Sequence, residues 1–313
     1  MSVKVFIDGS SGTTGLRIAD RLAQRPEIEL LSISAEGRKD VNERAKVINS
    51  ADLAFLCLPD AASKEVMPLL RPDVKVLDTS TAFRTDAAWD YGFPELKGQK
   101  AKIQNSYRVA VPGCYASGFI SIARPLVELG LAPASYPFSC TGISGYSGGG
   151  KKMIAEYEST DRPAHSKLDA PKSYGLGLAH KHLPEMQKIS GLAHTPMFVP
   201  VVCDYYCGMQ VLVPLDLKLA GTTAEKVAEG IAEYYKDAAT VKVHALNEAL
   251  PENGLYSNAM AGTDRMELYL TVNAAGDQMM LISLFDNLGK GSSGAALQCM
   301  NLMLGLPETE GLE

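Results

Sequence analysis

The first 24 residues constrain the fold most, because an apolar segment, a glycine-rich loop and an amphipathic segment follow one another directly. Residues 3–7 are predicted to form a strand, residues 8–15 a loop and residues 16–24 a helix. Glycines at positions 9, 12 and 15 let the backbone approach a pyrophosphate, which the helix N-terminus then binds. A tight turn without a ligand is the alternative, because the G-x-x-G-x-x-G spacing differs from the commoner G-x-G-x-x-G.

Strands and helices continue to alternate up to about residue 113. Further strands are predicted at residues 29–34, 51–59 and 75–78. This alternation predicts an α/β fold with a doubly wound parallel (Rossmann) sheet, whose ligand crevice lies at the carboxyl ends of the strands.

The residues that follow the second predicted strand bear on the choice of dinucleotide. Arg38 and Lys39 favour a 2′-phosphate and therefore NADP, whereas Glu36 is the residue type that would bind the ribose hydroxyls of NAD. A solvated basic pair with no ligand is the third interpretation.

The second half of the chain has a different pattern. Longer, more alternating strands are predicted at residues 135–141, 200–214, 266–274 and 278–285, which indicates an α+β region with a mixed or antiparallel sheet. Residues 142–150 are too rich in glycine for a predicted strand, and we expect a flexible linker or a backbone surface facing a ligand. A helix at residues 293–304 is expected to pack back on the first domain. The predicted domains are therefore 1–113 with 292–313, and 114–291.

Composition excludes several classes of function. The chain has 313 residues, a net charge of −6 and no basic run, which argues against a nucleic-acid surface. No apolar run approaches the roughly 20 residues that span a bilayer. The first predicted strand begins at residue 3, so we expect no signal peptide. Six dispersed cysteines form no disulfide pattern, which favours the cytoplasm.

Cys114 is the strongest candidate for a reactive residue. Pro112 and Gly113 form a sharp turn before a predicted helix at residues 115–128. At a helix N-terminus the backbone N–H groups and the dipole favour the thiolate, which is the nucleophilic form of cysteine. The alternative is a buried cysteine that packs as a small hydrophobe.

A histidine pair precedes a second predicted helix, which starts at Pro184. Since Pro184 disfavours the helical conformation at the residue before it, we expect an extended segment that places His180 and His182 on one face. Either ring could exchange protons with a thiolate. Surface histidines at a helix entry are the alternative. A metal site is disfavoured, because neither His180, His182 and Glu185 nor Cys203 with Cys207 has a second set of ligands at the required spacing.

Several short motifs occur in order along the whole chain. They are residues 9–15 (GSSGTTG), 58–59 (LP), 78–84 (DTSTAFR), 91–95 (YGFPE), 112–118 (PGCYASG), 144–145 (SG), 180–185 (HKHLPE) and 287–291 (NLGKG). Together they give the chain a resemblance to the N-acetyl-γ-glutamyl-phosphate reductases, in their short form, which are relatives of aspartate-semialdehyde dehydrogenase. Two departures are Val111, where longer members carry Asn, and Ser117, where Thr is usual.

This resemblance implies NADPH-dependent reduction of an acyl phosphate through a thioester on Cys114. It implies an acid–base function for His182, with His180 as the other candidate and as a substrate-binding residue. Arg84 would bind the substrate phosphate, although an interdomain ion pair is its alternative. Glu185 would bind the substrate amide or orient His182. The remaining implied residues are Ser144 for substrate, and Gly9, Ser11, Gly12, Thr13, Thr14, Gly15, Arg38, Leu58, Gly145, Asn287 and Gly289 for cofactor.

The same resemblance leaves related functions open. Aspartyl phosphate and N-acetyl-aminoadipyl phosphate are reduced by the same architecture, and one methylene is typically worth only about 1–3 kcal/mol of discrimination. A regulator that binds NADP without turnover is a remote alternative. The resemblance also implies a homo-oligomer, a dimer or a tetramer, with no nucleic-acid or membrane partner.

Overall fold

A computed structural model describes residues 2–313, which form two compact units. The first unit runs up to Pro94 and includes Gly98–Pro112 and Ser292–Leu312. The second comprises Glu95–Lys97, Gly113–Gly291 and Glu313. Residue 1, which the expected first domain includes, lies outside the described residues.

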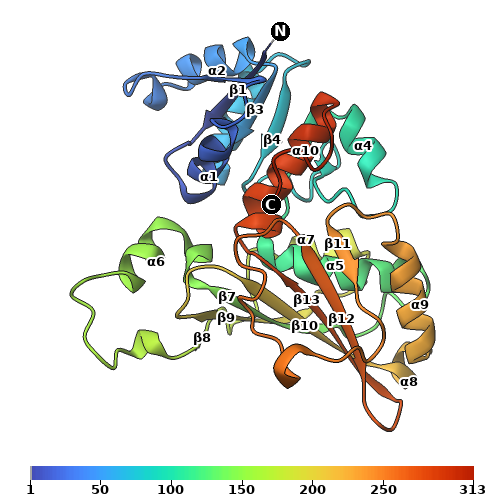
Figure 1. The fold of residues 1–313 in the computed structure, drawn as a ribbon. Helices are drawn as coiled ribbons and strands as arrows, with labels where there is room; N and C mark the ends of the chain where they lie inside the picture. Colours follow the sequence, from blue (N-terminus) through green and yellow to red (C-terminus); the bar gives the residue numbers. More distant parts are fainter. Residues whose placement is uncertain (1) are drawn as a thin grey trace. The chain divides into compact units, whose positions relative to one another are not determined.

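The first unit contains a six-stranded sheet in the order β2-β1-β3-β4-β6-β5, and every neighbouring pair is parallel (Figure 1). The predicted doubly wound parallel sheet is confirmed. Its elements are β1 (Val3–Asp8), α1 (Thr13–Leu22), β2 (Ile28–Leu31), a 3₁₀ turn (Gly37–Lys39), α2 (Val41–Ser50), β3 (Leu53–Leu56), α3 (Asp60–Val66), a 3₁₀ turn (Met67–Leu69), β4 (Lys75–Asp78), β5 (Asp90–Tyr91), α4 (Gln99–Asn105), β6 (Arg108–Ala110) and α10 (Gly294–Leu304).

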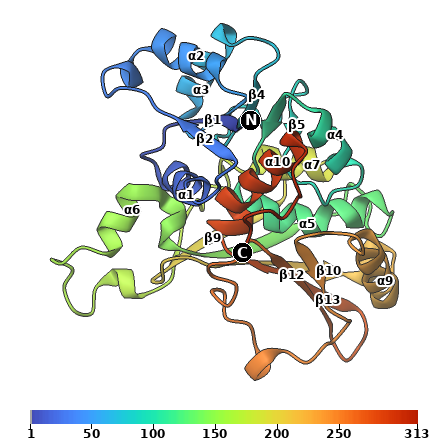
Figure 2. The ribbon, with the colours of Figure 1, turned by 45° about the horizontal axis from the view of Figure 1, so that its top comes forward.

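Alternate residues of the parallel strands belong to two separate cores. Val5 and Phe55 pack with α1, α4 and α10, whereas Phe6 and Ala54 pack with α2 and α3. Helices therefore cover both faces of this sheet, which is why its strands are apolar on both sides. Figure 2 shows α10 and α4 lying side by side.

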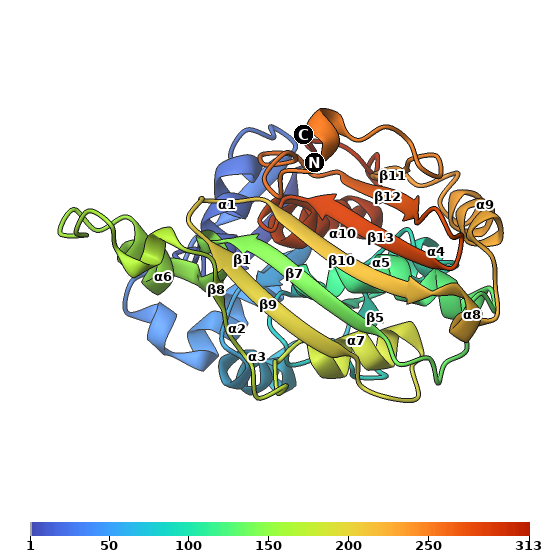
Figure 3. The ribbon, with the colours of Figure 1, turned by 90° about the horizontal axis from the view of Figure 1, so that it is seen from below.

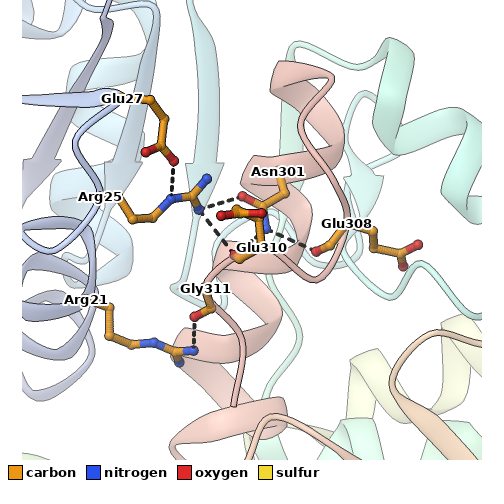
Figure 4. A network of polar contacts seen from close by, with 7 residues as sticks. All are labelled: Arg21, Arg25, Glu27, Asn301, Glu308, Glu310 and Gly311. Carbon is orange, nitrogen blue, oxygen red and sulfur yellow. Dashed lines mark hydrogen bonds and ion pairs between the residues drawn. The ribbon is translucent and has the colours of Figure 1, made fainter.

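Polar contacts fix the C-terminal segment within the first unit (Figure 4). The Arg25 guanidinium donates to Asn301 Oδ1 at 2.7 Å and to the Glu310 carbonyl at 3.3 Å. Arg21 donates to the Gly311 carbonyl at 2.7 Å. The last helix thus belongs to the same unit as β1, although about 180 residues of chain separate it from β6.

The second unit contains a mixed seven-stranded sheet in the order β11-β12-β13-β10-β7-β9-β8. The pairs β7–β9 and β11–β12 are parallel and the others antiparallel, as predicted for a mixed sheet. Its elements are α5 (Cys114–Glu128), β7 (Ser139–Gly145), a 3₁₀ turn (Tyr146–Gly149), α6 (Gly150–Tyr157), a 3₁₀ turn (Lys167–Asp169), β8 (Lys172–Ser173), α7 (Leu183–Ser190), β9 (Met197–Cys203), β10 (Met209–Asp216), α8 (Leu217–Ala220), α9 (Ala224–Tyr234), β11 (Val241–Val243), a 3₁₀ turn (Pro251–Asn253), β12 (Met266–Val272) and β13 (Gln278–Phe285); a π-helix (Gly289–Ser293) follows.

Helix α5 packs directly on this sheet. A Cβ on Gly118 would lie 2.6 Å from Val211 and 2.7 Å from Ser283, so the helix approaches β10 and β13 closely. Figure 3 shows α5 and α7 behind the strands and no helix in front of β7, β9 and β10. Helices thus cover one face of the sheet and leave the other open.

Three predictions in this unit were wrong. The single strand at residues 200–214 is two strands, since the chain reverses between Cys203 and Met209 and Gly208 adopts a φ of +118°. The strand predicted at residues 135–141 starts later and continues through the glycines to Gly145. The histidine segment is not extended: His182 is helical, with φ −84° and ψ −11°, and Leu183 already belongs to α7.

Candidate active site

Main-chain atoms pack closely against the glycine loop of the first unit. Gly9 has a φ of +88°, and a Cβ there would lie 2.3 Å from the Cys57 carbonyl oxygen at the end of β3. A Cβ on Gly15 would lie 2.5 Å from the Gly9 carbonyl oxygen. The loop can adopt this conformation only with glycine at both positions. The N-cap residue of α1, Gly12, makes no side-chain cap, and a helix N-terminus of this kind can bind a dinucleotide phosphate.

A cavity of about 370 Å³ lies beside this loop. Of the predicted cofactor residues, Gly9, Ser11, Arg38 and Leu58 line it, whereas residues 12–15 do not. Thr14 instead forms a 3.0 Å hydrogen bond between its hydroxyl and that of Ser292. The other lining residues are Phe6, Ile7, Asp8, Ser10, Ala19, Leu30, Leu31, Ser32 and Ile33.

The charges around this cavity fit an anionic ligand. Glu36 is not among the lining residues, whereas Arg38 is. The one acidic lining side chain, Asp8, is held by Arg44, whose Nε donates to Oδ2 at 2.8 Å. Burial raises the pKa of Asp8, and the hydrogen bond and charge of Arg44 oppose that shift. The residues present therefore fit a phosphate-bearing dinucleotide.

Cys114 is the first residue of α5 in the second unit. Gly113 precedes it with an extended backbone (φ −78°, ψ 143°), so the helix begins at the cysteine. The Gly113 N–H donates to Glu185 Oε1 at 2.9 Å, and Glu185 is only 2% exposed. Glu185 thus binds the turn that presents the thiol. Neither functional role expected for Glu185 included this contact.

The two histidines lie together at the start of α7. Their ring centroids are 4.8 Å apart, and the His182 backbone N–H donates to His180 Nδ1 at 3.2 Å. Both centroids lie 6.0 Å from the ring of Tyr115, the residue after the cysteine. Burial, with a smaller contribution from Lys181, lowers the pKa of His180 to about 4, so this ring is neutral at pH 7.

Tyr115 links the cysteine helix to β7 and β9. Its hydroxyl donates to the Val201 carbonyl at 3.1 Å and receives a 3.4 Å hydrogen bond from Tyr174. A Cβ on Gly142 would lie 2.4 Å from the Tyr115 ring. Position 142 of β7 therefore needs glycine, because any side chain there would clash with the Tyr115 ring. This packing explains why a strand contains glycine at this position.

Arg84 lies in the first unit and is 8% exposed. Its Nε donates to the Val111 carbonyl and its Nη2 to the Thr79 carbonyl, both at 2.9 Å. The side chain therefore braces the segment that leads to Pro112.

Four further predicted residues make hydrogen bonds or close backbone contacts within the second unit. The Ser144 hydroxyl donates to the Gly145 carbonyl at 3.1 Å. A Cβ on Gly145 would lie 2.6 Å from the carbonyl oxygens of residues 205 and 206, and one on Gly289 would lie 2.0 Å from that of residue 263. The Asn287 amide accepts from the Gly208 N–H at 2.8 Å and donates to the Ser147 hydroxyl at 3.0 Å. Close packing therefore requires glycine at both positions.

Comparisons with known proteins show the family of this chain. Residues 4–104 match the NAD-binding domain of the semialdehyde dehydrogenases, and residues 114–287 match their dimerisation domain. The N-acetyl-γ-glutamyl-phosphate reductase of Trichormus variabilis is 46% identical, with 99% of each chain covered. That of Burkholderia cenocepacia is 46% identical, with 96% of this chain and 97% of the relative covered. This chain belongs to the N-acetyl-γ-glutamyl-phosphate reductase family.

More distant structures share the fold of these reductases. Aspartate semialdehyde dehydrogenase from Francisella tularensis has a TM-score of 0.71 at 15% identity, covering 96% of this chain and 100% of its own. Aspartate semialdehyde dehydrogenase II from Vibrio cholerae has a TM-score of 0.68 at 17% identity, covering 97% and 99%. The fold and the resemblance predicted from the sequence are both confirmed.

Sequence reasoning missed several residues of the candidate site. Ser32 and Ile33 line the first-unit cavity, and their position after β2 could have indicated them. Tyr174 lies beside His180, with ring centroids 5.8 Å apart, yet no spacing pattern connects it to Cys114.

Among residues 2–313, no group of three or more His, Cys, Asp and Glu side chains is arranged to hold a metal ion. None of the described helices combines the length and apolar character needed to cross a membrane.

Proposed function

We propose that this protein reduces N-acetyl-γ-glutamyl phosphate to N-acetyl-glutamate semialdehyde and phosphate with NADPH, in arginine biosynthesis. The observation that carries the substrate is the 46% identity, along 99% of both chains, to a relative that bears this reductase name. The reaction chemistry is supported by Cys114 at the N-terminus of α5, beside a histidine pair.

Cys114 is the nucleophile of the proposed reaction. Its Sγ attacks the acyl carbon, the bond from that carbon to the phosphate oxygen breaks, and phosphate leaves with the electron pair. The product is a thioester, which accepts hydride far more readily than a carboxylate does. The N-terminal N–H groups of α5 favour the thiolate and the oxyanion of the tetrahedral intermediate.

His182 is the proposed acid–base group. It takes the proton from the hydroxyl of the thiohemiacetal, so that the carbonyl forms, the C–S bond breaks and the thiolate is regenerated. His180 supports it, since its Nδ1 accepts the His182 main-chain N–H and its ring is neutral. The imidazolium so formed gives its proton to the departing phosphate of the next turnover, which returns the ring to its neutral form.

Substrate binding is proposed for Arg84, His180, Glu185 and Ser144. Arg84 provides positive charge for the departing phosphate, while two of its nitrogens brace the main chain. Ser144 contacts the bound acyl group. Glu185 acts mainly by holding Gly113, and through it the position of the thiol.

NADPH is proposed to bind in the first unit, with residues 9–15, Arg38 and Leu58 holding its phosphates and adenosine. When bound, it supplies the hydride that reduces the thioester. Gly145, Asn287 and Gly289 are proposed to form the surface that meets the nicotinamide. Residues 1–113 with 292–313 thus form the cofactor domain, and residues 114–291 the catalytic and oligomerisation domain.

We propose a homodimer or homotetramer formed through the open face of the second sheet. The match of this region to a dimerisation domain supports the proposal. Met197 is 56% exposed on β9, and half-buried Val199, Val201 and Ile143 are its neighbours on the face that no helix covers in Figure 3. A cytoplasmic location is proposed because all six cysteines are thiols.

The reverse reaction tests the function. Purified protein is given NADP⁺, inorganic phosphate and either N-acetyl-glutamate semialdehyde, aspartate semialdehyde or the N-acetyl-aminoadipate homologue. The expected result is phosphate-dependent NADPH formation that is fastest with N-acetyl-glutamate semialdehyde. Faster turnover with another aldehyde would retain the chemistry but refute the substrate. No turnover by protein that still binds NADPH would favour a cofactor-sensing regulator.

A further inference from the structure

Lys290 and Glu95 form a buried ion pair in the second unit. Lys290 Nζ lies 2.8 Å from each carboxylate oxygen, and the two side chains are 2% and 1% exposed. The Thr240 hydroxyl donates to Glu95 Oε1 at 2.5 Å. Removing two charges from water is costly, and apolar side chains of similar volume are often as stabilising or more so. Stability alone therefore does not explain the pair.

Lys290 lies on the short π-helix that contacts the cysteine. The residue before it, Gly289, packs against the Thr263 carbonyl, and the residue after it faces Cys114. A Cβ on Gly291 would lie 3.0 Å from Cys114 Cβ, and the Gly291 N–H donates to the Asp286 carbonyl at 2.9 Å. π-Helical turns are frequent at functional sites. Any shift of Lys290 would move the backbone that contacts the proposed nucleophile.

Glu95 lies on a segment that is itself fixed to the cysteine helix. Residues 95–97 belong to the second unit, although the chain on both sides belongs to the first. The Lys97 N–H donates to the Tyr234 hydroxyl, which donates in turn to Glu128 in the last turn of α5, both at 3.0 Å. The ion pair therefore connects a segment anchored at the end of α5 with the π-helix packed at its start.

We propose that Lys290 and Glu95 are positioning residues for Cys114. The pair holds Gly291 against the β-carbon of the cysteine and so restricts the positions that the thiol can take. This inference rests on the proposed function of Cys114 as the reacting thiol. A charged pair suits the task because an ammonium held by both carboxylate oxygens has a more defined geometry than an apolar contact.

The test uses Lys290→Met, Glu95→Gln and the double variant. Lys290→Met alone leaves a buried unpaired carboxylate and can unfold the protein, whereas the double variant removes both charges. Readouts are the thermal midpoint, the pH dependence of Cys114 alkylation by iodoacetamide followed by peptide mass spectrometry, and kcat and KM in the phosphate-dependent assay. His244→Gln is the matched control, since it disrupts the contacts of another buried side chain of the same unit with two carboxylates, those of Glu248 and Glu267.

We expect the double variant to melt close to the wild type, and its kcat to fall by about 10- to 100-fold with little change in KM. Its alkylation profile should differ from that of the wild type, whereas His244→Gln should keep the wild-type profile. Wild-type alkylation and kcat in the double variant would overturn the inference, as would an equal loss in His244→Gln. The alkylation readout needs no substrate. Failure of the proposed function would therefore appear as a wild type without turnover, while the alkylation profile still differs between the wild type and the double variant.

Discussion

Glycines bring backbones into close contact in both units, but with different consequences. In the first unit, Gly9 and Gly15 lie against backbone carbonyl groups, and a cavity of about 370 Å³ lies beside the loop. In the second unit, Gly142 and Gly145 make room that the protein fills itself, with the Tyr115 ring and with backbone carbonyls. Close packing therefore requires glycine in both units. Only the cavity beside Gly9 distinguishes the first-unit loop as a candidate ligand site.

Replacing Cys114 with serine should give the largest difference between the two units, because it should abolish turnover in the second and leave NADPH binding in the first. We expect turnover to fall by at least about 10³-fold, because the hydroxyl is a far weaker nucleophile, while NADPH affinity stays unchanged. Isothermal titration and the phosphate-dependent assay measure the two quantities. Cys203→Ser, a half-buried thiol of β9, is the control and should retain turnover. Substantial turnover in Cys114→Ser would refute the nucleophile.

Gly9→Ala should damage the first unit alone. A φ of +88° costs a non-glycine residue about 1–3 kcal/mol, and the new Cβ would clash with the Cys57 carbonyl. We expect a lower thermal midpoint and a dissociation constant for NADPH raised by about tenfold or more.

Gly12→Ala is the informative partner of that variant. Its Cβ would lie 3.5 Å from the Gly9 carbonyl oxygen, which is ordinary contact, so folding should be unaffected. Weaker NADPH binding by this stable variant would then show that the bound cofactor lies against Gly12. Unchanged binding would contradict a ligand against this part of the loop.

Gly142→Ala should have the opposite effect to Gly9→Ala, since it should lower turnover and not NADPH affinity. Its Cβ would displace the Tyr115 ring, at a cost of about 1–3 kcal/mol, and with it the start of α5. We expect kcat to fall by about tenfold or more while NADPH affinity is retained. Gly177→Ala, which would meet no atom within 4 Å, is the control. A loss of NADPH affinity in Gly142→Ala would show that this glycine faces the cofactor.

This difference also explains how far the sequence could predict the structure. The strands β4 (Lys75–Asp78) and β13 (Gln278–Phe285) match their predicted bounds, because apolar composition and short connections define them. The second half of β7, residues 142–145, could not be predicted, since its glycines are explained only by the Tyr115 ring and by the residue 205–206 carbonyls, which come from other segments.

The candidate site was predictable to the same extent. Cys114 and the histidine pair carry local signals, a turn before a helix and a proline at a helix start. The contact of Glu185 with the Gly113 N–H and the pairing of Lys290 with Glu95 join residues 72 and 195 positions apart. No local pattern predicts such contacts, because each depends on how complete elements pack.

Arg38→Ala should sharpen the assignment of the first-unit cavity to NADP. A lost charge-assisted hydrogen bond to a 2′-phosphate is worth about 1.5–3 kcal/mol, so the KM for NADPH should rise about tenfold or more. The KM for NADH should change little, since it lacks that phosphate. Lys39→Ala is the control, because Lys39 is exposed but does not line the cavity. Equal changes for both cofactors would contradict 2′-phosphate recognition.

The smallest expected effect concerns His180 in the second unit. Its pKa is lowered from 6.5 to about 4 in the folded protein, chiefly by burial. Between these two pH values the unfolded chain therefore binds a proton that the folded protein does not, so stability is lost as pH falls from about 6.5 to 4. The slope cannot exceed about 1.4 kcal/mol per pH unit, and partial exposure of the ring should reduce it to about half of that. Urea unfolding at pH 6.5 and 4.5 should therefore show a flatter pH dependence in His180→Gln than in the wild type, whereas His194→Gln, at an exposed position, should match the wild type. An unchanged slope in His180→Gln would mean that the folded and unfolded states bind this proton equally between pH 6.5 and 4, and would contradict a ring that burial keeps neutral in that range.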